Sequence, residues 1–247
     1  MKWSKFALLL VLLLINSCTH STASLQKIEE MSIPIERVNN NVVALAEPRL
    51  FPISKKLIVI DAGHGGEDFG TQSPFKPVIK EKNLNLVAAN FLQGYLQQMG
   101  FMTAMTRKDD TFVSLDGRAE FANELKPALF VSVHFNSAPA VKAEGVEVFY
   151  YRSEQDKGRS AASKALAENI LNRIIINTDA NSRGVKHGDL AVIRKTNMPA
   201  VLVEGGFLTN ESEYQKLKDS AYVKRLMWGI AQGIQKFTSV PSQSEML

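Results

Sequence analysis

The stretch LIVIDAGHGG at residues 57–66 combines a predicted strand with a glycine-rich loop that carries a histidine. Residues 57–60 are all aliphatic, which is typical of a strand covered on both faces of a sheet. In an open sheet with parallel strands, functional groups gather beyond the carboxyl ends of the strands. His64 is therefore a candidate site residue by its position in the sequence.

Strands and helices alternate along the rest of the chain. Short aliphatic or alternating runs predict strands, and apolar residues at helical spacing predict helices. The predicted strands are residues 57–60, 101–106, 128–133, 146–151, 190–193 and 200–203, and the predicted helices are residues 84–99, 115–125, 159–174 and 221–237. This alternation predicts an α/β domain whose mostly parallel or mixed central sheet is covered by helices on both faces.

The composition is that of an ordinary globular protein. Of the 247 residues, 45% are hydrophobic and 22% are charged, and the net charge of +4 is not concentrated in basic runs. Because no basic patch with interleaved aromatic residues is present in the sequence, we expect no nucleic-acid partner. Residues 55–238 form one predicted folded domain, and residues 239–247 are predicted to be a disordered tail.

The first residues have the pattern of an export signal. Two lysines precede an apolar run at residues 6–15, which is too short for a permanent membrane span. Cys18 is the only cysteine and lies where cleavage is expected, so residues 1–17 resemble a bacterial lipoprotein signal that leaves Cys18 lipidated. An ordinary cleaved signal with an incidental cysteine is the alternative. Residues 18–54 lack a sustained period and predict a tether.

Candidate chemical groups follow three separate predicted strands. His64, His134 and Glu204 each come at the end of a strand, so we expect them at one edge of the sheet. Imidazole and carboxylate groups bind zinc, and a catalytic zinc leaves a position for water. Amide hydrolysis also needs an acid that moves a proton to the leaving nitrogen. Glu81, at the start of a predicted helix, is a second acid, and spacing does not decide which acid is ligand and which is base.

These segments, in this order, resemble the zinc-dependent N-acetylmuramoyl-L-alanine amidases of the cell-division type. The resemblance covers residues 56–237. Three departures from the family pattern, at Ala62, Val133 and Phe135, remove no functional group. The matching stretches are IVIDAGHGGEDFGT (58–71), KEKNLNL (80–86), TRKDDTFVSLDGRAEFAN (106–123), LFVSVHFNS (129–137), EGVEVFYY (144–151) and PAVLVEGGFLTN (199–210).

The resemblance implies a peptidoglycan hydrolase that uses one zinc ion per chain to cut the amide between N-acetylmuramic acid and L-alanine. It implies that His64, Glu81 and His134 hold the zinc and that Glu204 is the catalytic acid and base. Three further residues are candidates for contacts with the substrate or for orienting a zinc ligand. They are Asn136, beside the second ligand, His187, at a predicted peptide groove, and Asp61, after the first strand.

The lipoprotein-type signal and the amidase resemblance together predict where and with what the protein acts. Peptidoglycan or muropeptides are the expected substrates, a membrane is contacted through lipidated Cys18, and proteins of the division machinery are candidate partners. We expect a periplasmic monomer, and Thr19 after the cysteine favours the outer membrane as the site of anchoring. Many division amidases carry an inserted helix that blocks the site, and the short stretch at residues 152–163 leads us to expect none here.

Two other functions are compatible with the same residues. A zinc peptidase or deacetylase acting on another wall amide would use the same metal, and a lipoprotein that only binds peptidoglycan would need no catalysis. Ser73 and Lys76 match the S-x-x-K spacing of serine-based wall enzymes, but one such match is expected by chance in a chain with this many serines and lysines.

Overall fold

The computed structural model describes residues 56–239 of the chain. The expected signal at residues 1–17, the lipidation site Cys18 and the tether at residues 18–54 lie outside the described residues, as do residues 240–247 of the expected tail. Among the helices of residues 56–239, none is long and apolar enough to span a bilayer.

One mixed sheet forms the centre of the described part of the chain, with the strand order β2-β1-β3-β6-β4-β5. Neighbouring strands are parallel from β2 to β6, whereas β4 is antiparallel to β6 and parallel to β5. The mixed α/β architecture predicted from the sequence is therefore confirmed. The strands are β1 (Leu57–Ala62), β2 (Met102–Met105), β3 (Leu129–Asn136), β4 (Val146–Tyr150), β5 (Ser182–His187) and β6 (Ala200–Phe207).

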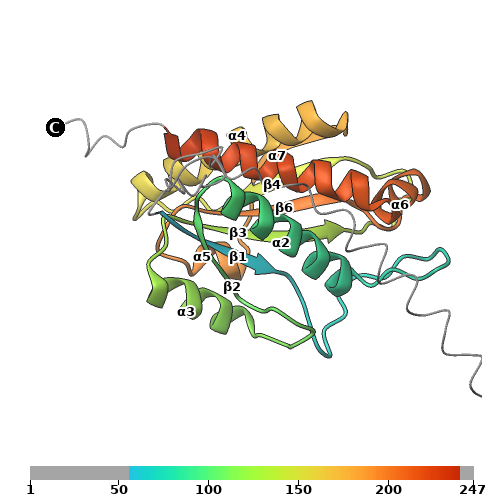
Figure 1. Ribbon diagram of the computed structural model, residues 1–247, viewed down its shortest axis with the longest axis horizontal. Helices are drawn as coiled ribbons and strands as arrows, with labels where there is room; N and C mark the ends of the chain where they lie inside the picture. The colour runs from blue at the N-terminus through green and yellow to red at the C-terminus, as the bar shows by residue number, and fades with distance from the viewer. Residues whose placement is uncertain (1–55, 240–247) are drawn as a thin grey trace, which may run out of the picture. The chain divides into compact units, whose positions relative to one another are not determined.

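Helices cover both faces of this sheet (Figure 1). One face packs against α2, α4 and α7, and the other packs against α3 and α5. Alternate side chains of each strand enter the two layers, so Val131 of β3 faces the first set of helices and Phe130 faces the second. The helices are α2 (Glu81–Gln98), α3 (Leu115–Leu125), α4 (Lys157–Thr178), α5 (Ala191–Arg194), α6 (Glu211–Lys218) and α7 (Ser220–Ser239).

The β1 strand shows why a continuous aliphatic run predicts a central strand. Ile58, Val59 and Ile60 are all fully buried, with Val59 in the layer of α3 and α5 and the two isoleucines in the other layer. Each buried aliphatic side chain contributes roughly 1.5–3 kcal/mol relative to an exposed one. The same burial fixes the register of the strand, because a shift by one residue would exchange the two layers.

Two glycines bring α7 unusually close to α4. A Cβ atom at Gly233 would lie 2.5 Å from the Cα atom of Ile170, and one at Gly229 would lie 2.8 Å from the Cα atom of Ile174. These neighbours are backbone atoms, which cannot move aside without shifting α4. The absence of a side chain at both positions therefore allows the two helix backbones to touch.

The predicted strand at residues 190–193 is wrong, because these residues begin the short helix α5 (Ala191–Arg194). A short apolar run has no period that separates a strand from a buried helical turn. Here Arg159 donates hydrogen bonds to the carbonyls of Ile193 (3.2 Å) and Thr196 (2.5 Å), which stabilises the turn. The strand in this part of the chain is instead β5 (Ser182–His187).

The C-terminal region also differs from the prediction. The helix α6 (Glu211–Lys218) was not predicted because it is short and mostly polar, and the side chain of Asn210 caps its first turn by accepting from the Glu213 amide at 3.1 Å. The last helix continues to Ser239, a residue that the prediction placed in the tail.

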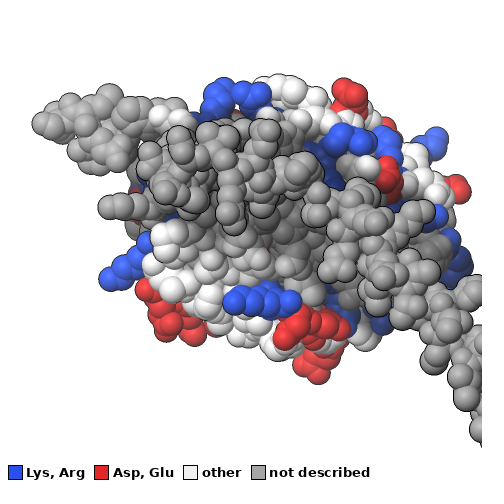
Figure 2. All heavy atoms as spheres, viewed as in Figure 1, with Lys and Arg blue, Asp and Glu red and all other residues white. Residues whose placement is uncertain are grey.

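The directions of the strands determine which strand ends lie together. Here an edge of the sheet means one of the two sides at which the strands begin or end. The carboxyl ends of β1, β3 and β6 lie at one edge, and the amino-terminal ends of β4 and β5 lie at the same edge. On the face shown in Figure 2, the visible basic side chains stand beside acidic ones. This mixed surface agrees with the modest net charge of +4.

Candidate metal centre

The loop after β1 turns sharply because of the residues next to His64. The His64 backbone has a φ of 60°, a left-handed conformation that is uncommon for residues other than glycine and is often found at functional sites. At Gly63, a Cβ atom would lie 2.1 Å from Nε2 of His134. The missing side chain at Gly63 therefore leaves room for the second imidazole, so the loop brings the two rings together.

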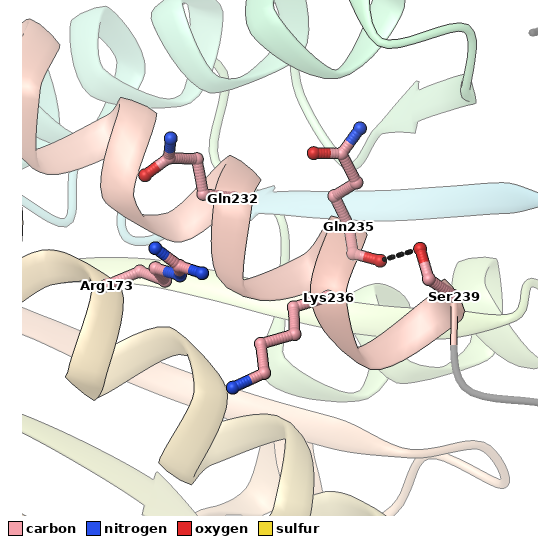
Figure 3. Close-up of a pocket in the computed structure, with 5 residues that line it drawn as sticks. All are labelled: Arg173, Gln232, Gln235, Lys236 and Ser239. Atoms are coloured by element: carbon pink, nitrogen blue, oxygen red, sulfur yellow. Dashed lines mark hydrogen bonds between the residues drawn. The ribbon is translucent and has the colours of Figure 1, made fainter. Parts of the chain in front are cut away.

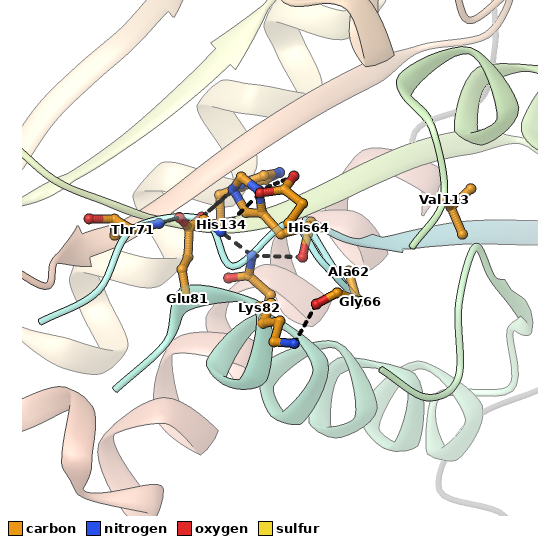
Figure 4. Close-up of polar contacts among 12 residues, drawn as sticks. Ala62, His64, Gly66, Thr71, Glu81, Lys82, Val113 and His134 are labelled. Atoms are coloured by element: carbon orange, nitrogen blue, oxygen red, sulfur yellow. Dashed lines mark hydrogen bonds and ion pairs between the residues drawn. The ribbon is translucent and has the colours of Figure 1, made fainter. Parts of the chain in front are cut away.

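Three side chains meet at this edge of the sheet. His64 comes from the loop after β1, His134 from β3, and Glu81 from the first turn of α2 (Figure 4). Each offers one ligand atom, and these atoms lie within 4.8 Å of one another. Oε1 of Glu81 is 3.2 Å from Nε2 of His64 and 2.9 Å from Nδ1 of His134. The imidazole rings stand edge to face, with centroids 4.9 Å apart.

This group fits a zinc ion by both chemistry and size. Two imidazoles and a carboxylate form a common ligand set of catalytic zinc sites, in which a water completes the coordination. Ligand atoms about 2.0–2.1 Å from a tetrahedral zinc are separated from one another by about 3.3 Å. The distances of 2.9 Å and 3.2 Å around Glu81 are close to that spacing. His64, Glu81 and His134 could therefore hold the ion with small side-chain movements.

The carboxylate of Glu81 is held by backbone donors from two sides. Its Oε2 accepts a hydrogen bond from the Thr71 amide at 2.9 Å, and its Oε1 accepts from the Phe135 amide at 3.3 Å. Burial alone would raise the pKa of Glu81, but contacts with His134 and His64 lower it well below the usual value. Glu81 is thus a pre-positioned anion at the start of a helix, where the helix dipole also stabilises negative charge.

Asp68 orients the first imidazole, a role that the sequence did not reveal. Its Oδ2 lies 2.7 Å from Nδ1 of His64, on the opposite side of the ring from Glu81. A carboxylate on the second nitrogen of a metal-binding histidine fixes the tautomer of the ring and increases its basicity. Burial alone would lower the pKa of His64, but Glu81 and Asp68 raise it. The only signal in the sequence is an acid four residues after the histidine in a glycine-rich loop.

Asp61, predicted to orient a ligand, acts one step further away. It is fully buried, and its oxygens accept from Arg118 (2.7 Å), Thr106 (2.6 Å) and Ser132 (2.6 Å). Burial would raise the pKa of Asp61, but the Arg118 charge and these hydrogen bonds lower it. Arg118 in turn donates to the backbone carbonyl of His64 at 2.7 Å. Asp61 therefore supports the His64 loop through Arg118 and does not contact the imidazole in this structure.

Glu204 lies on β6, level with His134 of β3 in the paired register. Its Oε2 is buried, and no residue between 56 and 239 donates a hydrogen bond to it. Burial raises the pKa of Glu204 well above the usual value, and the nearby carboxylates of Glu81 and Glu147 raise it further. A raised pKa makes a carboxyl easier to protonate, which suits a group that must both accept and release a proton.

A cavity of about 260 Å³ is lined by Glu204 and by the two histidines of the metal-ligand group. Its polar lining includes His64, Asp68, His134 and Glu204. The remaining wall is largely apolar and comes from the segment before and into α3, from α5 and from β6. These apolar residues are Phe112, Val113, Leu115, Leu190, Ala191, Val192 and Leu202. The volume is small for a complete ligand pocket and suits the part of a substrate nearest the reacting bond.

A second hollow, of about 430 Å³, lies between α4 and α7 (Figure 3). Its lining contains neither imidazole nor carboxylate groups, so it offers no ligand set for zinc. The lining residues are Arg173, Gln232, Gln235, Lys236 and Ser239.

The other sequence candidates lie outside the metal-ligand group. Asn136 donates to Oε1 of Glu147 at 2.7 Å. His187 ends β5 beside Tyr150, which is level with Val201 near the start of β6, so the ring lies toward the opposite edge of the sheet from Glu204. The hydroxyl of Ser73 accepts from the Ile79 amide at 2.9 Å and is 4% exposed, which indicates a role in holding its loop.

Comparison with known proteins agrees with this geometry. Residues 58–236 match the family model Amidase_3, described as N-acetylmuramoyl-L-alanine amidase. The chain belongs to this amidase family. The match includes every residue of the metal-ligand group as well as Glu204.

Solved amidase structures resemble this family member over most of the described chain. An N-acetylmuramoyl-L-alanine amidase from Clostridium difficile 630 is 35% identical, with a TM-score of 0.71, and the alignment covers 76% of this chain and 99% of that one. The CwlD amidase from Clostridioides difficile, solved in complex with the GerS lipoprotein, is 32% identical with a TM-score of 0.70, covering 76% of this chain and 100% of that one.

Relatives known by sequence include a probable cell wall amidase, LytH, from Staphylococcus aureus. It is 32% identical to this amidase over 201 residues, which are 81% of this chain. The chain spans 65% of the length of that relative.

Proposed function

We propose that the protein is a zinc-dependent amidase that hydrolyses the bond between N-acetylmuramic acid and L-alanine in peptidoglycan. The observation that supports this most strongly is the joint geometry of His64, Glu81 and His134, with Glu204 lining the same cavity as the two histidines and its buried Oε2 accepting no hydrogen bond from residues 56–239. Family membership supports the class of substrate. Neither the metal-ligand group nor Glu204 alone would indicate hydrolysis.

Each residue has a distinct task in this reaction. When bound, zinc supplies Lewis-acid activation of water and of the scissile carbonyl. His64, Glu81 and His134 would hold the ion, and Asp68 would keep the His64 ring oriented. Glu204 accepts a proton from the attacking water and delivers it to the departing L-alanine nitrogen. Its raised pKa allows it to hold that proton between the two steps.

Products from a defined muramyl peptide test the proposal. The purified, zinc-loaded chain should release an intact stem peptide with a free L-alanine amino group, identified by mass. Glu204→Gln should bind zinc as wild type does but reduce kcat by at least about 10²-fold. A matched control is Glu168→Gln, because Glu168 lies on α4 and its exposed carboxylate pairs with Lys164 away from the cavity.

Other products would identify another enzyme. Shortened stem peptides would indicate a peptidase, and release of acetate would indicate a deacetylase. Tight binding of the muramyl peptide with no product, by a zinc-loaded chain, would indicate a protein that only binds the wall. Each of these outcomes would contradict the amidase proposal.

We further propose that the protein is exported and anchored to a membrane through a lipidated Cys18, with residues 18–54 as a tether to the catalytic domain. The signal-like pattern of residues 1–17 supports export, and Thr19 favours the outer membrane of a two-membrane cell. The complex of CwlD with GerS supports a search for protein partners of this amidase, including division proteins. Labelling with a radioactive fatty acid should be lost in Cys18→Ser, and retained label would refute lipidation at this residue.

A further inference from the structure

A second charged cluster lies beside Glu204, on the side away from the metal-ligand group. Glu147 of β4 is directly opposite Glu204 in the antiparallel register of β4 and β6. Directly opposed residues point to the same face of a sheet, with Cβ atoms about 4.5–5.5 Å apart. Glu147 is 4% exposed. Two acids that face one another this closely need compensation by positive charge.

Glu147 has that compensation, and more than it requires. Its Oε2 contacts Nζ of Lys186 and lies 3.0 Å from Nε of Arg183, and its Oε1 accepts from Asn136 at 2.7 Å. Two cations thus share one carboxylate. Two further acids lie at this end of β4: Oε1 of Glu144 accepts a hydrogen bond from Asn181 at 2.6 Å, and Oε1 of Glu213 accepts from the Gly145 amide at 2.9 Å.

Both cations are held in place and yet reach solvent. The Lys186 side chain is 40% exposed and that of Arg183 is 33% exposed. The Arg183 guanidinium lies over the Phe207 ring, 4.8 Å from its centroid, which limits its movement. An ammonium group has three donors, so the Lys186 contact with Glu147 leaves donors for a ligand. A carboxylate is the ligand group that matches two such cations.

The chemistry of the reaction sets the direction in which the substrate lies. The scissile carbonyl must approach the group of His64, Glu81 and His134, while the leaving nitrogen must reach Glu204. A stem peptide that continues in this direction past Glu204 crosses β4 toward β5, in the order given by the sheet. The glycan extends the other way.

The distances along this path agree with the second residue of the peptide. One residue of extended chain spans about 3.3–3.6 Å, so a group on the second residue lies about 7 Å from the scissile nitrogen. The strands β6 and β5 are two strand spacings apart, or about 9.5 Å. Lys186 and Arg183 reach back from β5 to Glu147 on β4, which shortens the gap. In peptidoglycan the second residue is a D-glutamate linked through its γ-carboxyl, so its α-carboxyl is either free or amidated.

We propose that Lys186 and Arg183 bind the free α-carboxylate of the second stem-peptide residue, and that the enzyme therefore prefers acidic stem peptides over amidated ones. The inference rests on the proposed amidase function, because the direction of the peptide follows from the task of Glu204. It assigns substrate selectivity to β5, which carries no residue of the metal-ligand group.

Two muramyl tripeptides that differ only in this carboxyl test the proposal. Wild type should have a lower KM for the free acid than for the amide. Lys186→Gln should raise KM for the acid by up to about fivefold, as expected for a partly exposed charge pair, while kcat and the KM for the amide stay within about twofold. Arg183→Gln should act in the same direction, and Lys186→Arg should retain selectivity. Lys164→Gln, on exposed α4, is the matched control.

Equal changes of KM for the acid and the amide would overturn the proposal, because a merely structural role of Lys186 cannot distinguish the two substrates. Calorimetric binding of both tripeptides to the Glu204→Gln chain gives the same comparison without hydrolysis. If wild type cleaves neither tripeptide, the amidase function fails, whereas the difference in affinity still decides the carboxylate contact. Tighter binding of the acid, abolished by Lys186→Gln, is the expected result, and equal affinities would refute the contact.

Discussion

Replacing Glu204 with glutamine should stabilise the metal-free protein relative to wild type, increasingly so as the pH rises. Glu204 is buried, its Oε2 has no hydrogen-bond donor among residues 56–239, and the carboxylates of Glu81 and Glu147 lie near it. These conditions disfavour its ionised form and raise its pKa. Glu204→Gln removes the titrating group and preserves the shape of the side chain.

The sign and size of this change in the free energy of unfolding follow from proton linkage. Unfolded Glu204 has the usual pKa of 4.5, so above that pH the unfolded chain releases a proton that the folded chain retains. The contribution of protonated Glu204 to the free energy of unfolding is therefore fully present below pH 4.5. It is lost as the pH rises toward the raised pKa of the folded state. The slope is about 1.4 kcal/mol per pH unit within that window, because one proton separates the two states. The buried amide of glutamine adds a cost of about 1–3 kcal/mol that does not vary with pH.

Urea unfolding in the presence of a chelator, followed by tryptophan fluorescence from pH 5 to pH 8, measures this difference. The variant should gain stability relative to wild type with rising pH, whatever the constant offset. The other ionisable groups are common to both chains, so the difference curve isolates Glu204 to first order. Glu168→Gln on exposed α4 should follow wild type throughout.

A difference curve that stays flat within about 0.5 kcal/mol would refute the reasoning, since it would show that Glu204 ionises as easily in the folded chain as in the unfolded one. Glutamate at this position would then lack the raised pKa that supports its role as proton carrier. Loss of hydrolysis in the same variant would need another explanation.

Three further predictions concern the groups around the site and the packing of the helices. Asp68→Asn should weaken zinc affinity about 10–100-fold, measured by competition with a chelating dye, because it removes the carboxylate 2.7 Å from Nδ1 of His64; unchanged affinity would contradict the orienting role. Arg118→Met should lower the free energy of unfolding in urea by about 3–5 kcal/mol, because it leaves the fully buried Asp61 without its cation, and a loss below 1 kcal/mol would argue against this. Gly233→Ala should lower the thermal midpoint because its Cβ would meet α4 backbone at 2.5 Å, whereas Gly94→Ala, with open space around it, should not.

The parts of the fold and site that were predictable depend on local patterns. A continuous aliphatic run fixed β1 as a central strand, and the rule of strand ends then selected His64, His134 and Glu204. All three lie at one edge of the sheet, together with Glu81 at the start of α2. Deciding which acid is ligand and which is base required the family resemblance, because both acids occupy equivalent kinds of position.

The parts that were not predictable depend on contacts between distant segments. β5 was missed because Ser182–His187 is polar and contains a glycine. Its strand conformation comes from pairing with β4 as an outermost strand of the sheet. The apolar run of α5 suggested a strand, and the helical turn is stabilised by Arg159 from α4. The partners of Glu147 come from β3 and β5, so no pattern within β4 indicates its charge cluster.

The place of β6 in the sheet has a consequence for a partly exported or cleaved chain. β3 and β4 follow one another in sequence, but β6 lies between them in space. A chain that ends before residue 200 would therefore have a gap in its sheet and would lack Glu204. Such a fragment could still contain His64, Glu81 and His134, and so could capture zinc while lacking the carboxylate that we propose as the proton carrier. The cell wall would meet a competent hydrolase only after nearly the whole domain had crossed the membrane and folded.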